Sequence, residues 1–289
     1  MNFTRILYPV DFSERSRVVA PYVHAAVKRH GASLTLANFV EIPALWYGTA
    51  EAPCAPDLNI GGMIDDAAER LKAFACEFFP DLKPQILAEE GEPGTSIAEL
   101  VKEMGIDLVM MPTRGRGRFR AALLGSATAK VLHDVGCAVW TAAHAEEPGY
   151  AASPEWRNVV CAIDGTGDAQ RLIQCAGEIA SSFGSRVHLV HALPPAPATK
   201  MEQYLSRDFD EALKASARRE IAALQKDAGT DFRVCVETGD AATVVASIAE
   251  KDRADLVLIG RGILPHFAGR LRTHVYAIVR DAPCPVLSI

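Results

Sequence analysis

Residues 105–126 read GIDLVMMPTRGRGRFRAALLGS, which places a glycine-rich loop between an apolar run and the start of a second apolar segment. The run at 107–111 is of the kind that makes a fully buried parallel strand, and it breaks at Pro112. Residues 127–133 have the apolar periodicity of a helix. A buried strand, a loop and a helix in this order form the repeating unit of an α/β fold.

The loop in this segment has the features of a phosphate site. Gly115 and Gly117 let backbone N–H groups come close to an anion, because glycine has no side chain in the way. Gly125 and Ser126 open the helix, and a helix N-terminus with a Ser hydroxyl and free amides attracts phosphate. The segment is not a Walker P-loop, since no Gly-Lys-Ser/Thr follows, and the GxGxxG pattern fails at Arg120.

Strands and helices alternate along the first half of the chain. This alternation implies right-handed crossovers and a parallel sheet that is covered on both faces. The expected strands are Arg5–Val10, Leu34–Val40, Gln85–Glu89, Asp107–Met111 and Ala138–Ala142. The expected helices run from a cap at Ser13 to His30, where Gly31 stops the helix, and over Met63–Phe79, Thr95–Met104 and Ala127–His133.

The second half of the chain repeats the first. Asn158–Asp164 matches Ile6–Asp11 with an offset of 153 residues, and Ala254–Ile259 matches Ile106–Met111 with an offset of 148. Self-similarity over the whole length indicates a tandem duplication, with a stretch that lacks periodicity between the copies. We therefore predict a domain at 1–145, a linker at 146–156 and a second domain at 157–289.

The glycine-rich loop resembles the nucleotide-binding signature of the universal stress protein family, which is Gly, two residues, Gly, nine residues, Gly, then Ser or Thr. In this chain the second Gly is Gly115 and the closing pair is Gly125-Ser126, whereas Pro112 replaces the first Gly. The resemblance covers almost all of the chain, as two fused copies. It implies two tandem doubly wound α/β domains, each a five-stranded parallel sheet of order 3-2-1-4-5 with helices on both faces.

The resemblance also implies which residues face the nucleotide. Strands one and four are neighbours in this order, at the point where the winding reverses and ligands bind. Asp11 matches the acidic residue that contacts the nucleoside, Pro9 matches its usual neighbour, and Phe39 matches a position whose backbone contacts adenine. From the residues alone, Asp11 can instead serve only as a helix cap, and Phe39 only as a core side chain.

Two further stretches bear on phosphate binding. Arg116 directly follows Gly115 and is a candidate contact, and Ala127 belongs to the helix start. The alternating arginines at 114–120 fit a polyphosphate clamp and a solvated charged edge equally well. Residues 91–95, GEPGT, look faintly like a phosphate loop, but we interpret them as a turn at a helix start with Thr95 as the cap.

The second copy differs from the first at the phosphate loop. At the matched positions it has Gly260 for Pro112, Ile263 for Gly115, Arg272 for Gly125 and Thr273 for Ser126. Branched and bulky side chains there fill the space that a phosphate would use, so we predict a degenerate second site. The alternative is that Gly262 and Arg261 restore binding in a different geometry.

Composition limits the classes of function. With 49% hydrophobic and 23% charged residues, the 289-residue chain can bury a full core. A net charge of -6 argues against a general nucleic-acid surface. The seven cysteines form no CxxC pair, which indicates reduced thiols. The start of the chain shows no signal-peptide pattern, and no run of about 18 apolar residues occurs, so we expect a cytoplasmic protein without a membrane segment.

Other chemistry finds little support in the sequence. His188 and His191 stand three apart on an expected strand, so they face opposite sides and cannot chelate one metal together. The chain has no GxSxG elbow, no HExxH and no placed general base. We therefore predict neither a catalytic residue nor a metal site.

Together with the resemblance, these features predict a stress protein whose first domain binds ATP, ADP or AMP, with or without Mg²⁺. We expect it to be non-enzymatic, or to hydrolyse ATP very weakly. We also expect a protein partner to recognise whether nucleotide is bound. The last strands, 138–142 and 286–289, are natural edges for an internal pseudo-dimer or a homodimer. Two alternatives stay open: a slow ATP hydrolase or nucleotidyl transfer enzyme of the same fold, and a nucleotide-free interaction scaffold.

Overall fold

The computed structural model describes most of the chain, which falls into two compact units, Asn2–Val139 and Trp140–Ile289. The described residues are 1–42, 59–113, 124–143, 155–164, 168–194, 202–261 and 270–289, with only the backbone for 202–208 and 270–273. Most of the linker expected at 146–156 lies outside these ranges. None of the helices in the described part of the chain has the length and apolar character to cross a membrane.

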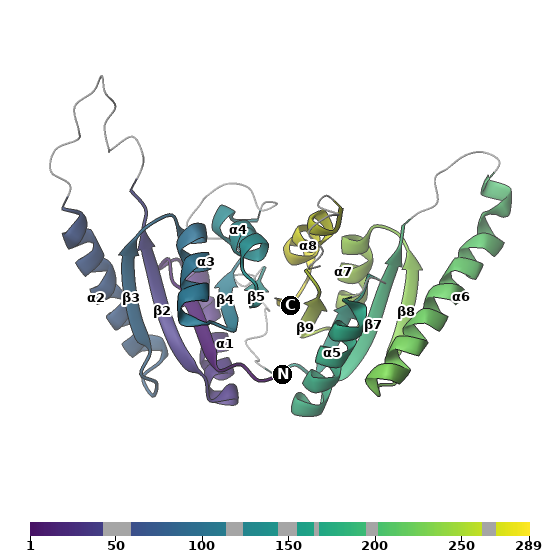
Figure 1. The fold of residues 1–289 in the computed structure, drawn as a ribbon, viewed down its shortest axis with the longest axis horizontal. Coiled ribbons are helices and arrows are strands. Elements are labelled where there is room, and N and C mark those ends of the chain that lie inside the picture. Colours follow the sequence, from purple (N-terminus) through teal and green to yellow (C-terminus); the bar gives the residue numbers. More distant parts are fainter. Residues whose placement is uncertain (43–58, 114–123, 144–154, 165–167, 195–201, 262–269) are drawn as a thin grey trace, which may run out of the picture. The chain divides into compact units, whose positions relative to one another are not determined.

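The first half is a parallel sheet covered by helices (Figure 1). Its strands lie in the order β3-β2-β1-β4-β5, as expected, and the pairs β1–β2, β1–β4 and β2–β3 are all parallel. Every residue of β4 is buried, which explains its apolar sequence. The elements are β1 Arg5–Pro9, α1 Glu14–His30, β2 Ser33–Val40, α2 Ile60–Phe78, β3 Gln85–Glu90, α3 Pro93–Met104, β4 Leu108–Pro112, α4 Ser126–Asp134 and β5 Ala138–Ala142.

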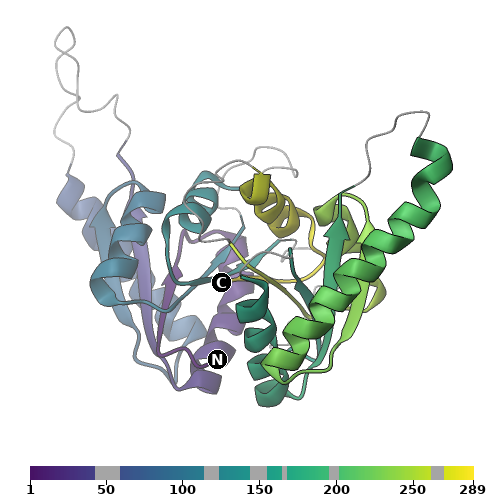
Figure 2. The same ribbon diagram turned by 45° about the vertical axis from the view of Figure 1, so that its right-hand side comes forward.

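The second half has the same winding, with strand order β8-β7-β6-β9-β10. Its longest helix, α6, packs along β8 and beside α5 (Figure 2). The elements are β6 Asn158–Ala162, α5 Ala169–Phe183, β7 Arg186–Leu193, α6 Glu202–Ala228, β8 Arg233–Thr238, α7 Ala241–Lys251, β9 Leu256–Ile259, α8 Arg270–Asp281 and β10 Val286–Ser288. The predicted fold class, two tandem doubly wound α/β sheets, is confirmed.

Strand register shows the duplication residue by residue. Ile6 pairs with Leu34 in the first half, and Val159 pairs with Val187 in the second, so both partners shift by 153 residues. Ile6 and Val159 also pair with β4 and β9 at positions that differ by 148, Leu108 and Leu256. The offsets that the sequence motifs predict are therefore also the offsets of the hydrogen-bonded ladders.

Helix boundaries follow local capping. Ser13 caps α1 by accepting a hydrogen bond from the Ser16 amide, and Gly31 ends the helix with φ 61°, so both predictions are confirmed. The start of α2 was expected at Met63, but the helix begins at Ile60. The reason is Asn59, whose side chain accepts from the Gly62 amide and so begins the helix one turn earlier.

The aspartate at the start of the fourth strand ties that strand to the first. The Asp107 carboxylate accepts from the Thr4 amide and hydroxyl, both at 2.7 Å, and from the Arg5 amide at 3.0 Å. In the second half, Asp255 accepts from the amides of Arg157 and Asn158 at 3.0 and 2.8 Å. The repeated Asp-Leu-Val motif is therefore a structural clamp, and neither aspartate is among the described residues that line the two clefts discussed below.

Replacing Asp107 by Ala should destabilise the first unit. The backbone amides of Thr4 and Arg5 lose their acceptor, and because the site is partly exposed we expect a loss of about 1–2 kcal/mol in the free energy of unfolding. A lower urea midpoint and faster hydrogen exchange at these two amides would report it. Asp107→Asn keeps one acceptor oxygen, so its urea midpoint should lie between those of the parent and Asp107→Ala. An unchanged midpoint would show that water replaces the clamp at no cost.

Candidate functional site

A cleft of about 810 Å³ opens at the carboxyl ends of the central strands of the first half. This is the place in a doubly wound sheet where the winding reverses and ligands bind. Seven of the nine site residues predicted from the sequence line it: Pro9, Asp11, Phe39, Pro112, Gly125, Ser126 and Ala127. The other two, Gly115 and Arg116, lie outside the described residues.

Asp11 follows β1 and has two different carboxylate oxygens. Its Oδ1 accepts from the Ser13 amide at 3.0 Å and from the hydroxyls of Ser13 and Ser16, both at 2.6 Å. Its Oδ2 is buried and has no hydrogen-bond partner in the part of the chain that the structure describes. One oxygen thus orders the start of α1, while the other is an acceptor to which none of the described residues donates, on a residue that lines the cleft.

The residue after Asp11 has an unusual backbone. Phe12 has φ 61°, a left-handed conformation that costs a bulky residue about 1–2 kcal/mol. The Arg70 guanidinium lies 4.0 Å from the centre of its ring, a cation–π contact. Arg70 comes from α2, which also lines the cleft with Met63 and Asp66. This wall is not among the predictions from the sequence, although the spacing of these α2 residues puts them on one helix face.

The end of β2 supplies the wall next to Asp11. The Phe39 side chain is 9% exposed and belongs to the core, so the core role considered for it holds. Phe39 is also one of the residues that line the cleft. The neighbouring Asn38 donates from Nδ2 to the Val10 carbonyl at 2.7 Å, which fixes the end of β1 against β2.

The N-terminus of α4 faces the cleft without a side-chain cap. Gly125 is the N-cap, with φ -63° and ψ 144°, and no side chain of the described residues accepts a hydrogen bond there. The Gly125 amide donates to the Thr113 carbonyl at 2.9 Å, and the Thr128 hydroxyl donates to the Pro112 carbonyl at 3.2 Å. These bonds join the end of β4 to the helix start and leave the first amides of α4 for an anion.

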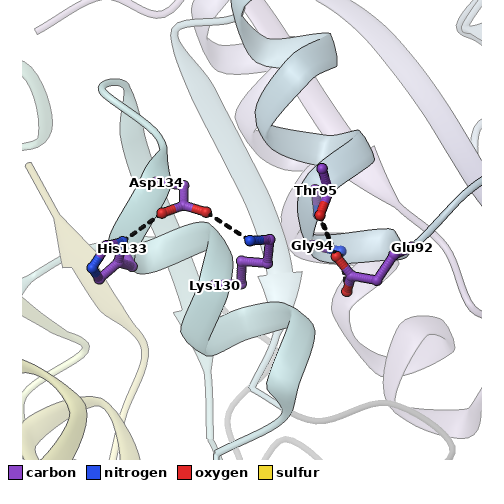
Figure 3. A network of polar contacts seen from close by, with 6 residues as sticks. All are labelled: Glu92, Gly94, Thr95, Lys130, His133 and Asp134. Carbon is purple, nitrogen blue, oxygen red and sulfur yellow. Dashed lines mark hydrogen bonds and ion pairs between the residues drawn. The ribbon is translucent and has the colours of Figure 1, made fainter.

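The start of α3 is filled by its own residues (Figure 3). Glu92 accepts from the Gly94 amide at 3.0 Å, and from the Thr95 amide and hydroxyl at 2.7 and 2.6 Å. The prediction of Thr95 as the cap is therefore wrong: Glu92 is the cap and Pro93 is the first helical residue. Because a carboxylate already occupies these amides, residues 91–95 form a helix-start turn and offer no phosphate loop.

The cap at Glu92 should give a pH-dependent stability. Burial raises the pKa of Glu92, but the hydrogen bonds from Thr95 and Gly94 outweigh it, and the pKa is lowered from 4.5. A lowered pKa in the folded state means that the ionised cap stabilises above the unfolded pKa and that this contribution is lost as pH falls through the folded pKa. Glu92→Gln should therefore be less stable than the parent at neutral pH, by less than about 1 kcal/mol, and approach it in acid.

Urea unfolding of both proteins between neutral pH and pH values below the folded pKa of Glu92 measures this difference. Asp240→Asn is a parallel test in the second half and should show the same loss of stability at neutral pH. Asp240 caps α7, and the backbone hydrogen bond from Thr243 lowers its pKa in the same direction. A difference that stays constant with pH would mean that the Glu92 charge contributes nothing to the cap.

The second half contains an equivalent cleft of about 480 Å³ with a different helix start. Helix α8 begins at Arg270, three residues before Thr273, the match of Ser126. The amides that follow Thr273 are therefore inside the helix, where those of α4 are free at its end. This difference supports the predicted degeneracy. Ile263 and Gly262, and the side chains of Arg272 and Thr273, lie outside what the structure describes.

The two histidines on β7 have separate partners. His188 Nδ1 pairs with an Asp252 carboxylate oxygen, and His191 Nδ1 lies 2.8 Å from the Ile163 carbonyl. Across the described ranges, no three His, Cys, Asp or Glu side chains gather as a metal site would require.

Comparisons with known proteins agree with this architecture. The model of the universal stress protein family matches residues 2–142 and again residues 155–289. A universal stress protein of Thermus aquaticus is 31% identical over 141 residues, which are 46% of this chain and 98% of that protein. One from Synechocystis is 29% identical over 140 residues, 47% of this chain and 83% of that protein.

A solved structure shows the same fold over the full length. The crystal structure of a universal stress protein from Archaeoglobus fulgidus superposes with a TM-score of 0.69 and 21% identity, and the match covers 99% of this chain and 96% of that chain. At this identity the likeness concerns the fold alone.

Proposed function

The chain belongs to the universal stress protein family in both of its halves, and from that premise we propose that its first cleft binds an adenine nucleotide, with ATP as the leading candidate. The observation that carries the proposal is the pairing, in one cleft, of a helix start and a carboxylate oxygen for which the described residues supply neither a side-chain cap nor a donor. Phosphates supply the anion that the helix start lacks, and a ribose or adenine edge supplies the donor.

Each proposed contact has a chemical reason. The first amides of α4 and the Ser126 hydroxyl hold phosphate oxygens, with Gly115 and Arg116 completing the phosphate site from the loop. Asp11 accepts from the nucleoside through Oδ2. The backbone at Phe39 contacts adenine, while Pro9 and Pro112 shape the ends of the two strands. Ala127 contributes an amide and leaves room for the ligand.

The proposed role is regulatory: nucleotide occupancy changes how a protein partner recognises this chain, in a stress response. ATP, ADP or AMP, with or without Mg²⁺, is the proposed ligand, and hydrolysis is absent or very weak. The division into domains at 1–145 and 157–289, the internal pseudo-dimer or homodimer, and a cytoplasmic location belong to the same proposal and stay predictions.

Calorimetric titration of the full chain tests the proposal. ATP, ADP, AMP and adenosine are titrated in turn with GTP as the control, and mass spectrometry identifies any nucleotide released when freshly purified protein is denatured. We expect affinity to fall from ATP to adenosine, because phosphate contacts are lost stepwise. Phosphate release from Mg-ATP above background would instead favour a slow hydrolase. No heat and no released nucleotide would favour the nucleotide-free scaffold and reject the proposal.

A further inference from the structure

The cleft of the second half is built from the same positions as the first. Asp164, Gly260 and His274 line it where Asp11, Pro112 and Ala127 line the first cleft. The scaffold hydrogen bonds repeat as well. The Ile163 amide donates to the Val190 carbonyl at 2.9 Å, as the Val10 amide donates to the Ala37 carbonyl at 2.8 Å. A duplicated cleft of about 480 Å³ is thus kept although its phosphate end differs.

The walls of this second cleft are apolar. The residue that matches Phe39 is Ala192, so the large side chain at the end of β2 has become a small one at the end of β7. Gly260 lets the Leu172 side chain form part of the wall, since a Cβ at Gly260 would lie only 2.9 Å from Leu172 Cδ1. The larger apolar lining side chains include Ile163, Leu172, Val190, Ile259, Val275 and Ile278.

The polar groups at this cleft disfavour an anion. Three carboxylates line it, Asp164, Asp168 and Asp240, together with the His274 imidazole, which interacts electrostatically with Asp240; none of its described lining residues is Lys or Arg. The Asp240 carboxylate accepts from the Thr243 amide at 3.0 Å and so occupies the start of α7. That hydrogen bond also lowers the pKa of Asp240, which keeps the group charged at neutral pH. A phosphate would meet carboxylates on one side and an altered helix start on the other.

We propose that the second cleft is a separate small-molecule site, which takes an organic cation with a flat or compact apolar body and an amine, and no phosphate. The apolar body fits between the strand ends and α8, and the amine lies near the three carboxylates. The cavity volume is within the range of about 300–1,000 Å³ that such sites have. This inference does not rest on nucleotide binding in the first half.

Three probes with one indole ring separate charge from shape. Tryptamine is a cation, indole is neutral and indole-3-acetate is an anion, and each is titrated into the full chain by calorimetry and saturation-transfer NMR. We expect tryptamine to bind more tightly than indole, and at least about tenfold more tightly than indole-3-acetate. Similar affinity for the three probes, or no binding of tryptamine at millimolar concentration, would overturn the proposal.

Two variants locate the binding. Ala192→Phe puts a larger side chain at a residue that lines the cleft, and it should reduce tryptamine binding at least tenfold by taking up cleft volume, while urea unfolding checks that the second half still folds. Asp164→Asn should reduce the affinity for tryptamine several-fold and leave the affinity for indole unchanged. ATP affinity should be the same in both variants. Tryptamine binding that survives Ala192→Phe, or that ATP displaces in competition, would place the probe elsewhere and reject the site.

Discussion

Gly125→Asp should reduce ATP affinity by about 100-fold or more, without destabilising the fold. Gly125 is the N-cap of α4, and its φ of -63° and ψ of 144° suit an aspartate without strain. A carboxylate at this position can accept from the first amides of the helix, as Glu92 does at the start of α3. The protein's own anion would then occupy the place that we assign to phosphate, and calorimetric titration with ATP measures the loss.

The controls for this variant separate charge, size and folding. Gly125→Ala adds only a methyl group, and Gly125→Asn adds a neutral cap, so both should retain more ATP affinity than Gly125→Asp. Urea unfolding should show Gly125→Asp to be as stable as the parent, or up to about 1 kcal/mol more stable, because a cap is gained. Adenosine affinity should change little, since adenosine has no phosphate. Equal ATP affinity in the parent and in Gly125→Asp would show that the start of α4 does not bind the phosphates.

Much of the fold followed from patterns that short segments contain. The run before Pro112 is buried at every position of β4, and the motif offsets of 153 and 148 reappear as strand register. These predictions succeeded because burial and duplication leave regular marks on neighbouring residues. The strand order came from family resemblance, since the order in which strands pair is decided by contacts far apart in the chain.

The errors have local physical causes. Thr95 fits a helix cap by residue type, but Pro93 is favoured at the first helical position, and this points to Glu92 as the cap. Asn59 likewise precedes the expected start of α2 and begins the helix earlier. The contribution of α2 to the cleft is of another kind. The sequence shows that Asp66 and Arg70 share a helix face, whereas only the packed structure shows that this face meets the ligand cleft.

Asp11→Asn should reduce the affinities for adenosine, AMP and ATP by the same factor, about 10- to 100-fold. The reason is that hydrogen bonds to a charged acceptor contribute about 1.5–3 kcal/mol. The amide oxygen can keep the three bonds that Oδ1 now accepts, so the start of α1 is retained and stability should change little. The amide nitrogen then replaces Oδ2, and a ligand N–H or O–H meets a donor where it needs an acceptor.

The dependence on phosphate number makes this variant decisive when it is compared with Gly125→Asp. If adenosine and ATP lose affinity equally, Asp11 contacts the nucleoside. If only ATP loses affinity, Asp11 instead contacts the phosphates or their metal ion. Asp164→Asn, the matched change in the second half, should leave all three affinities unchanged. If Asp11→Asn binds as the parent does, Oδ2 has no ligand partner and the residue acts only in ordering α1, because its other oxygen already accepts from Ser13 and Ser16.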